Sequence, residues 1–371
     1  MVPKRRVWVL CVASALLAAA LAASGALYYV YAGSLGRIYG VVNLIDKYFY
    51  KPVDRAKAFE DAARGAVASL EDPYSTFMSK MEWENFNVRT SGEYSGIGIT
   101  MDARDNRVRI AQPMKGTPAG DAGLLADDVI LKVDGKPIYT SDEAASLIRG
   151  PAGTQVTLTI LRGTETFDVT LTRREISIPA TEYSMMDGNV GYIHLLSFNE
   201  HSASETSKAL QDLRSQGAKA IILDLRYNGG GYVDQCRQIA ELFVPKGVLT
   251  TLRYKAQPDE VYETRGQGLD LPLFVLVNKG TASASEILAG AIQDRKSGIL
   301  IGDTTFGKGL VQGAFFFKDG SVIKLTTAEY LTPSGRTISG VGLTPDVAVS
   351  GDSAQLSTAL DMAKAAIAAV K

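Results

Sequence analysis

The stretch Leu273–Ile292, LFVLVNKGTASASEILAGAI, decides how the larger part of this 371-residue chain folds. Its first five residues are all apolar, which predicts a buried strand over Leu273–Val277. Small residues follow, and apolar residues spaced three and four apart predict a helix over Ser285–Ile292. Ser283 lies at the junction between them. A hydroxyl there faces unpaired backbone N–H groups and the positive end of a helix dipole, so Ser283 is a candidate nucleophile.

The same alternation of apolar runs and helical periodicity extends on both sides of this stretch. It predicts a layered α/β domain over 177–350, followed by a C-terminal helix over 351–371. The expected strands are Val190–Leu195, Ala218–Leu225, Ile299–Gly302, Ala314–Phe317 and Val322–Thr327, and the expected helices are Ser204–Leu213 and Val233–Leu242.

A different texture of short strands and glycine turns occupies 91–176. A helix is expected over Ser141–Ile148 with Ser141 as its N-cap. Gly96-Ile97-Gly98-Ile99 forms a loop whose consecutive N–H groups can hold a carboxylate. The order of elements resembles a PDZ domain, which implies a β-domain that binds peptide C-termini along a sheet edge, with the last side chain in an apolar pocket.

The N-terminus predicts export. Lys4, Arg5 and Arg6 precede the run 7–36, which carries no charge and exceeds the roughly 20 helical residues that a bilayer core requires. Residues 1–36 are therefore a membrane anchor, with the remainder extracytoplasmic, or a cleaved signal peptide. The length of the run favours the anchor.

Residues 37–90 have helical periodicity, interrupted at Pro52 and again at Asp72-Pro73. The pattern is compatible with a stalk, a lid or an arm that forms a homodimer, and periodicity does not choose among them. The expected fold is thus a mixed α/β and β multidomain chain with an N-terminal transmembrane helix, a helical segment, a PDZ-like domain and an α/β core.

Composition excludes several function classes. The net charge is −1, so no basic field draws the chain to nucleic acid. Cys236 has no neighbouring His/Cys cluster and is expected to occupy an ordinary buried position. No metal-ligand spacing and no phosphate-binding GxxxxGK[ST] motif occurs, so neither a metal nor another cofactor is expected.

A serine nucleophile needs a base to take its proton. His194 and His201 are the two histidines, and their contexts, an apolar strand and the start of a helix, favour structural roles. Lys308 lies between Gly307 and Gly309, which permit close approach to another backbone. Because burial makes a lysine ammonium lose its proton more readily, Lys308 is the better candidate.

The segments Thr281–Glu286 and Phe306–Gln312 resemble the carboxyl-terminal processing (tail-specific) serine peptidases. That resemblance implies that Ser283 and Lys308, 25 positions apart (308 − 283), form the catalytic pair and that Gln312 hydrogen-bonds the lysine. It also implies an oxyanion hole built from the N–H groups of Ala284 and Gly230, in the segment 224–231, which is similar to the family's D-L-R-x-N-P-G-G. Gly229 replaces the family's proline, so Gly231 is the alternative donor.

The resemblance implies a serine endopeptidase that binds apolar C-terminal tails of protein substrates through its PDZ domain. It also implies that this domain closes the cleft until a tail binds. The competing interpretation is a catalytically silent, membrane-tethered PDZ scaffold. A β-lactamase-like acyltransferase would have the motif S-x-x-K at Ser283, and Glu286 occupies the position of that lysine, so this class is excluded at this motif. Glu286 could orient Lys308, but its place at the start of a helix favours a role as a partner of the helix dipole. Asp224 and Arg226 are interpreted as groups that hold their loop by hydrogen bonds.

Overall fold

The computed structural model describes residues 15–26, 33–105 and 107–369. The chain divides into two compact units, 1–79 and 80–371, each of which is described by itself. Residues 15–26 are helical. None of the helices in the described ranges has the length and hydropathy needed to cross a bilayer. The expected anchor falls partly on residues 1–14 and 27–32, which lie outside the described ranges, so it stays a prediction.

The first unit is built from two helices and a short strand, α2 (Ser34–Tyr48), α3 (Arg55–Ala68) and β1 (Thr76–Met78). The interruption expected at Pro52 is confirmed, since α3 begins after Asp54, whose side chain accepts the N–H groups of Ala56 and Lys57. Helix α2 exposes an apolar face made of Leu35, Ile38, Tyr39, Val41, Leu44, Ile45 and Tyr48. The homodimer stays a prediction.

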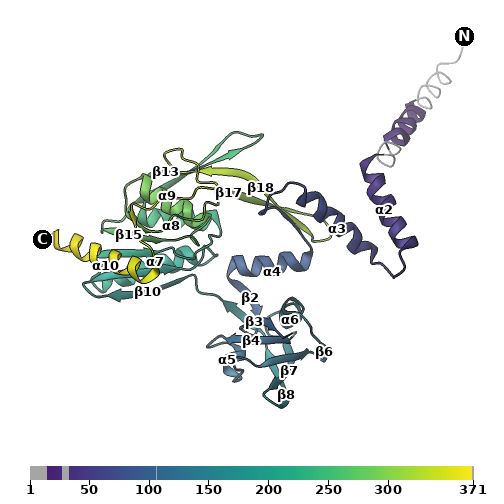
Figure 1. Cartoon of the computed structure of the whole chain (residues 1–371), viewed down its shortest axis with the longest axis horizontal. Helices are drawn as coiled ribbons and strands as arrows, with labels where there is room; N and C mark the ends of the chain where they lie inside the picture. The colour runs from purple at the N-terminus through teal and green to yellow at the C-terminus, as the bar shows by residue number, and fades with distance from the viewer. Residues whose placement is uncertain (1–14, 27–32, 106, 370–371) are drawn as a thin grey trace, which may run out of the picture. The chain divides into compact units, whose positions relative to one another are not determined.

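The second unit begins with helix α4 (Lys80–Ser91). Strand β2 (Glu93–Gly96) follows it and pairs with β9 (Arg174–Ser177) in a two-stranded antiparallel ribbon. The chain between these two strands forms a small β-domain. That domain has strands β3 (Ile99–Arg104), β4 (Arg107–Pro113), β5 (Val129–Val133), β6 (Lys136–Pro137), β7 (Gln155–Arg162) and β8 (Glu165–Thr172), with helices α5 (Pro118–Asp121) and α6 (Ser141–Ile148). Its sheet has the strand order β3-β4-β5-β7-β8, and Figure 1 shows this domain with strands β3, β4, β6, β7 and β8 and helices α5 and α6 labelled.

Helix α6 has the expected bounds, but the expected N-cap is wrong by one residue. Thr140 caps the helix, because its hydroxyl accepts the N–H of Glu143 at 3.2 Å. In turn, a carboxylate oxygen of Glu143 accepts the N–H of Thr140, also at 3.2 Å. This reciprocal pair satisfies two backbone donors, and the Ser141 hydroxyl has no part in it.

The α/β core contains a six-stranded sheet in the order β10-β11-β12-β15-β16-β19. Its strands are β10 (Thr181–Met186), β11 (Val190–Leu195), β12 (Ala220–Asp224), β15 (Leu273–Val277), β16 (Ile299–Gly302) and β19 (Val347–Ala348). Only the β10–β11 pair is antiparallel among these described strands. The central strands are buried on both faces, which explains their unbroken apolar runs.

Side chains that alternate along β12 and β15 enter two separate cores. Leu223 and Val275 pack with α7 (Ser202–Ser215), α8 (Val233–Phe243) and α9 (Ala284–Asp294) on one face. Ile222 and Phe274 pack with the C-terminal helix α10 (Asp352–Ala369) on the other. The sheet is therefore the middle of three layers, as a mostly parallel sheet requires.

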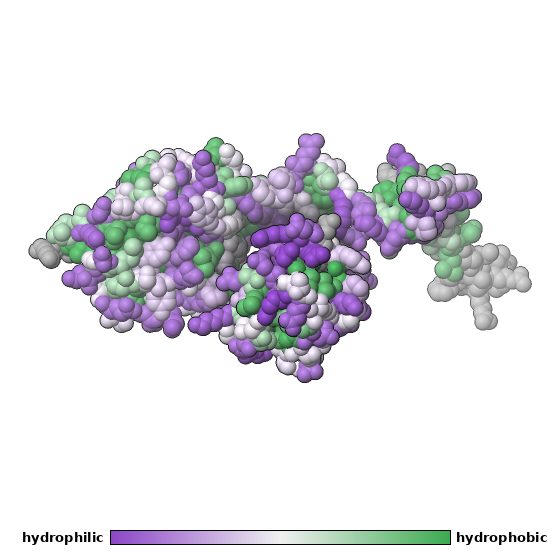
Figure 2. All heavy atoms as spheres, turned by 60° about the horizontal axis from the view of Figure 1, so that its bottom comes forward, coloured by the Kyte–Doolittle hydropathy of each residue, from purple (hydrophilic) through white to green (hydrophobic). Residues whose placement is uncertain are grey.

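A second, antiparallel sheet contains β13 (Pro245–Tyr254), β14 (Glu260–Gln267), β17 (Leu310–Phe316) and β18 (Val322–Leu331). Strand β17 begins two residues after Lys308 and pairs with β18, so this sheet carries the segment that holds the candidate base. The face drawn in Figure 2 is mostly hydrophilic, with small scattered hydrophobic areas, because the long apolar runs are used in the cores.

Candidate active site

The topology brings two loops together at one edge of the sheet. Strands β12 and β15 are parallel neighbours, so the segments that follow their carboxyl ends, 225–231 and 278–283, lie beside each other. Hydrogen bonds join them: the carbonyl of Asn228 accepts the N–H of Ala282 at 3.0 Å and the hydroxyl of Ser285 at 2.9 Å. The carbonyl end of a parallel sheet is where α/β proteins usually bind ligands.

Ser283 lies at the turn between β15 and α9 in a conformation that is rare for a residue with a side chain. Its φ is 60° and its ψ is −121°. Such backbone angles cost on the order of 1–3 kcal/mol and persist where the surrounding structure enforces them, often at functional sites. The N–H of Glu286 donates to the main-chain carbonyl of Ser283 at 2.8 Å, so the start of the helix is tied through the backbone.

The Glu286 carboxylate joins the candidate nucleophile to the candidate base. It is fully buried. Its Oε2 accepts the N–H groups of Ser283 and Lys308, both at 2.9 Å. Its Oε1 accepts the N–H of Gly307 at 2.8 Å and the hydroxyl of Thr305 at 2.5 Å. A buried carboxylate with this many donors is well compensated and fixes its partners in place. Sequence reasoning considered that Glu286 could orient Lys308 but preferred the interpretation as a helix-dipole partner, and it did not foresee the bond to the N–H of Ser283.

The glycines beside Lys308 have the close packing that the sequence predicts. Gly307 has a φ of +87°, and an added Cβ would come within 2.9 Å of the backbone nitrogen of Gly342. At Gly309 an added Cβ would come within 2.7 Å of the nitrogen of Ser339. The segment 307–309 is thus held against a neighbouring backbone on both sides of Lys308.

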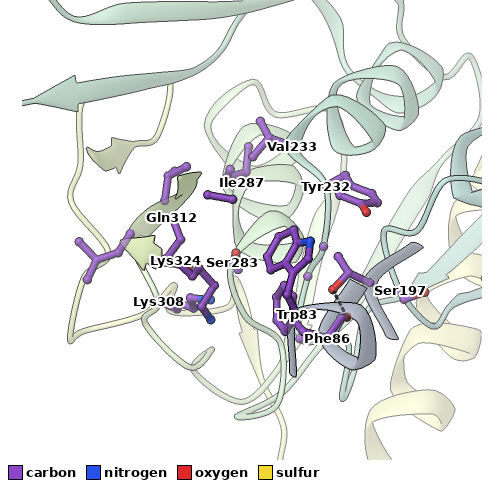
Figure 3. Close-up of a pocket in the computed structure, with 17 residues that line it drawn as sticks. Trp83, Phe86, Ser197, Tyr232, Val233, Ser283, Ile287, Lys308, Gln312 and Lys324 are labelled. Carbon is purple, nitrogen blue, oxygen red and sulfur yellow. Dashed lines mark hydrogen bonds between the residues drawn. The ribbon is translucent and has the colours of Figure 1, made fainter. Parts of the chain in front are cut away.

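The expected catalytic residues meet at one cavity of about 440 Å³. Figure 3 shows Ser283, Lys308 and Gln312 around it. The side-chain amide of Gln312 donates to the hydroxyl of Thr326 at 3.3 Å. The full lining is Trp83, Phe86, Thr90, Ser197, Gly229, Gly230, Gly231, Tyr232, Val233, Ser283, Ile287, Lys308, Leu310, Val311, Gln312, Ala314 and Lys324. None of these lining residues is a histidine, so His194 and His201 do not line the cavity.

Gly230 lies directly against the candidate nucleophile. An added Cβ there would stand 2.8 Å from the Ser283 Cβ and from the Ala284 nitrogen. Its own N–H donates to Asn228 Oδ1 at 2.9 Å, so it can donate to an oxyanion only after that bond is released. Gly231 lines the same cavity, and Ala284 opens helix α9. Gly229 has open space around the position of a Cβ.

The supporting residues have the structural roles that the sequence indicates. Asp224 receives the Arg226 guanidinium through Nε at 3.0 Å and Nη2 at 2.6 Å, and the hydroxyl of Tyr192 at 2.7 Å. Burial and the hydrogen bond to Asp224 raise the pKa of the Tyr192 phenol. Cys236 is fully buried, which confirms the expectation of a buried position, and burial raises the pKa of its thiol.

A second cavity, of about 150 Å³, lies beside the glycine loop of the β-domain. Ile97, Gly98 and Ile99 line it, whereas Gly96 does not. The other lining residues are Val88, Tyr94, Thr100, Met101, Met114, Ala145, Ile148, Arg149 and Ile178. Gly98 has a φ of +78°, the glycine conformation that such a loop needs. The groove is mostly apolar and lies between β3 and α6.

Helix α4 supplies residues to both cavities, which sequence reasoning did not foresee. Trp83, Phe86 and Thr90, three and four positions apart, line the larger cavity. Val88 lines the smaller one, and Asn85 accepts a hydrogen bond from Arg149 at the end of α6. Trp83 also packs edge-on against Phe316 of β17, with ring centroids 5.3 Å apart. The spacing of Trp83, Phe86 and Thr90 was the available signal for a helical face.

Comparisons with known proteins agree with this architecture. Family models match residues 189–349 (Peptidase family S41), 109–162 (PDZ domain) and 21–82 (Activating protease CtpB N-terminal domain). The chain is 38% identical over 322 residues to a "Probable CtpA-like serine protease" of Staphylococcus aureus strain COL, covering 85% of this chain and 65% of that one. The corresponding protein of Staphylococcus haemolyticus is 38% identical over 308 residues, covering 81% and 62%. The chain thus spans somewhat less than two thirds of these curated relatives.

A solved structure gives the fuller match. The photosystem II D1 C-terminal processing protease is 31% identical, with a TM-score of 0.52, over 87% of this chain and 88% of that one. Sequence and fold therefore agree over nearly the whole of both chains, and the chain belongs to peptidase family S41, the carboxyl-terminal processing serine proteases that carry a PDZ domain.

Proposed function

We propose that the protein is a serine endopeptidase in which Ser283 is the nucleophile and Lys308 the general base. The observation that carries this proposal is the Glu286 carboxylate, because one of its oxygens accepts the backbone N–H of both residues. The buried carboxylate thus links the two loops that carry the proposed nucleophile and base. Positioning of a nucleophile and its base within a fixed geometry is a large source of catalytic rate.

The reaction begins when the neutral amine of Lys308 takes the proton of the Ser283 hydroxyl. The Ser283 oxygen bonds to a peptide carbonyl carbon, and the carbonyl oxygen becomes an oxyanion. When the C–N bond breaks, Lys308 returns the proton to the leaving amine. Lys308 then takes a proton from a water molecule, which attacks the acyl-enzyme, and the proton returns to the Ser283 oxygen as the acyl group leaves. Gln312, on β17 of the same cavity wall, helps to orient the lysine side chain.

The oxyanion hole is assigned to the N–H of Ala284 together with an N–H of the 229–231 loop. Each such donor contributes on the order of 3 kcal/mol in other hydrolases. Gly230 stays the proposed second donor, with Gly231 as the alternative. Because the Gly230 N–H is bonded to Asn228, the active arrangement requires that this loop turns toward the cavity.

Substrate proteins are proposed to dock by an apolar C-terminal tail in the groove beside Ile97, Gly98 and Ile99. Its apolar lining and its place beside a glycine loop support this assignment. The basic flank and the apolar run before residue 37 support a membrane-anchored protein whose catalytic part is extracytoplasmic.

Helix α4 supports coupling between tail binding and access to the cleft. The same helix places Trp83 in the catalytic cavity and Val88 in the groove for the tail. A tail that enters the groove contacts Val88, so it shifts the preferred position of α4. We expect Trp83→Ala to raise the basal rate of cleavage without a tail several-fold, measured on a short fluorogenic peptide.

The test of the proposed function uses the full chain in detergent with an unfolded protein that ends in apolar residues. Mass spectrometry follows the fragments for wild type, Ser283→Ala and Lys308→Ala, and calorimetry follows binding of the tail. We expect wild type to cut and both variants to bind without cutting. Cleavage that persists in Ser283→Ala contradicts the assigned nucleophile, and binding without cleavage by all three favours the scaffold.

A further inference from the structure

The loop that carries Gly230 contains a residue with a large side chain, Tyr227, in a backbone conformation that favours glycine. Its φ is 60°, the same value as that of Ser283. Residues with side chains keep such angles where their surroundings enforce them, often at functional sites. Tyr227 is 68% exposed, so burial does not enforce its conformation. Contacts with two other segments hold it instead.

The first of these segments is the loop that carries the proposed nucleophile. The N–H of Tyr227 donates to Asn278 Oδ1 at 3.0 Å, and the N–H of Gly280 donates to the same oxygen at 2.9 Å. The Tyr227 ring lies against Gly280, where an added Cβ would come within 3.1 Å of the ring carbon Cδ1. Tyr227 therefore sets the spacing between the segments 225–231 and 278–283.

The second segment is the C-terminal helix. The Tyr227 hydroxyl donates to Asp352 Oδ2 at 2.8 Å, and Asp352 is the first residue of α10. This hydrogen bond raises the pKa of the Tyr227 phenol, so the hydroxyl keeps its proton and stays a donor. The guanidinium of Arg226 donates to the main-chain carbonyl of Asp352 at 2.7 Å. Two consecutive residues of the loop thus bind the same residue of α10.

The start of α10 is itself anchored. Gln355 is fully buried. Its side-chain amide donates to Asp303 Oδ2 and to the carbonyl of Val349, both at 2.9 Å. Arg226, on the loop side, is buried and paired with Asp224. Because the backbones on both sides of the Tyr227 hydroxyl bond are already fixed, little further ordering is needed to form it.

We propose that Tyr227 is a positioning residue of the oxyanion hole, and that its hydrogen bond to Asp352 makes α10 a support of that hole. The inference rests on the peptidase activity proposed above. With this end of the loop held by α10, the turn that frees the Gly230 N–H is confined to the glycines at 229–231. The donor then meets the oxyanion at a fixed distance, as stabilisation of a transition state requires.

The experiment uses the full chain in detergent, with an apolar-tail peptide present at a fixed, saturating concentration. Steady-state cleavage of one fluorogenic peptide gives kcat and KM. Binding is measured for two inhibitors of one sequence, the first ending in an aldehyde and the second in the corresponding alcohol. The Ser283 oxygen adds to the aldehyde carbon and leaves the former carbonyl oxygen in the oxyanion hole, whereas the alcohol binds without a new bond.

Tyr227→Phe removes the hydroxyl and keeps the ring against Gly280. We expect it to lower kcat about 5-fold with KM within about two-fold, because a hydrogen bond between an exposed hydroxyl and a carboxylate is worth roughly that much. Affinity for the aldehyde should fall by about the same factor, and affinity for the alcohol should not change.

Further variants assign the effect to the bond between the two side chains. Asp352→Ala should reproduce the losses, and the double variant should lose no more than either single one, since each removes the same bond. Asp352→Asn keeps an oxygen that can accept the phenol proton, so it should retain most of the rate. Tyr183→Phe is the matched control, because its hydroxyl also donates to an exposed carboxylate, that of Asp212, at 2.6 Å. Neither residue of the control pair lines the catalytic cavity, and we expect unchanged kinetics.

The outcomes separate this inference from the one on which it rests. Unchanged kcat and aldehyde affinity in Tyr227→Phe overturn the role of Tyr227 and leave the peptidase intact. An equal fall in affinity for aldehyde and alcohol overturns it too, since the whole cleft would then have changed, as do losses that multiply in the double variant. Wild type that neither cuts the peptide nor binds the aldehyde more tightly than the alcohol overturns the proposed function, and the role of Tyr227 falls with it.

Discussion

The two cavities of the second unit are held in different ways. At the cavity lined by Ser283 and Lys308, the loops that carry these two residues and Gly230 are tied together by the buried Glu286 carboxylate and the Asn228 carbonyl. The cavity of the PDZ domain has walls of apolar side chains on β3 and α6, with the glycine loop at one end. Chemistry requires that a few atoms stay at fixed distances, whereas tail binding requires an apolar slot and a free sheet edge.

This difference predicts how substitutions act on activity. Changes in the tied loops lower the rate of cleavage for every substrate. Changes in the apolar slot weaken the binding of tails and leave the chemistry intact. Of the four predictions that follow, from the largest expected effect to the smallest, the first three test this division and the fourth concerns the stability of the PDZ domain.

Glu286→Gln is expected to lower kcat at least about 100-fold, a loss in the range of those seen when a fixed catalytic donor is removed. In the wild type the N–H groups of Ser283 and Lys308 both donate to one carboxylate oxygen. A glutamine side chain has one oxygen and one NH₂ group, so it cannot accept every hydrogen bond that the carboxylate accepts, and the two segments lose their common acceptor. Steady-state kinetics on one peptide measure the effect. Binding of an apolar tail to the PDZ domain, followed by calorimetry, serves as the check that the variant is folded. Unchanged kcat would remove Glu286 from the machinery.

Gly230→Ala is expected to lower kcat about 10- to 100-fold, because its Cβ would collide with Ser283 and Ala284 and its φ is +96°. Gly229→Ala is the matched control, since its Cβ meets open space. We expect the control to keep its activity within about two-fold. Equal losses in the two variants would mean that loop flexibility, and not contact with the nucleophile, sets the rate.

Ala145→Phe fills the PDZ groove and is expected to raise KM for tailed substrates about 10-fold with kcat little changed. Ser146→Phe, on the exposed side of the same helix, provides the control. Calorimetry with a tail peptide and kinetics with a tailed substrate measure the two variants. If cleavage of a tailed substrate persists at an unchanged KM in Ala145→Phe, tails bind elsewhere.

The smallest expected effect is on the free energy of unfolding and comes from replacing Asp128. Burial is the largest single influence and favours its neutral form, but the hydrogen bonds from Arg162 and from the Leu125 N–H, with the charge of Arg162, together outweigh burial and lower the pKa of the carboxyl. The stabilisation is therefore complete above the unfolded value of about 3.9 and is lost as pH falls through the lower folded value. Asp128→Asn is expected to cost about 1 kcal/mol at pH 7.

Hydrogen exchange of the β5 and β7 amides in the full chain measures this effect. The difference between wild type and Asp128→Asn should shrink as pH is lowered below about 4. A difference that stays constant with pH would mean that shape, and not charge, explains the loss. Arg162→Gln is the complementary variant, since it removes the other member of the pair.

Much of the core could be predicted from the sequence, because its signals are local. The strand Leu273–Val277 has the expected bounds, and helix α8 extends one residue beyond them. The β13–β14 hairpin was not predicted. Its strands deviate from regular register at two places, so apolar and polar residues do not alternate along β13. Alternation is the signal by which a half-buried strand is recognised.

The candidate site was predictable in composition and not in its connections. Ser283, Lys308 and Gln312 do gather at one cavity. The roles of Glu286 and α4 depend on contacts between segments distant in sequence. Glu286 bonds to a loop about 20 residues later. The apolar residues of α4, Met81, Trp83, Phe86 and Val88, follow no single helical face, because two faces of this helix meet two different cavities.

The indole of Trp83 gives the cleft a chromophore of its own. The chain has two tryptophans, Trp8 and Trp83, so a Trp8→Phe variant emits from the cleft alone. Packed against Phe86 and Phe316, this indole is partly shielded from water, and its emission moves to longer wavelength when the shield is lost. Stopped-flow fluorescence can therefore compare the time course of the proposed movement of α4 with that of the first cleavage and show which of the two sets the rate.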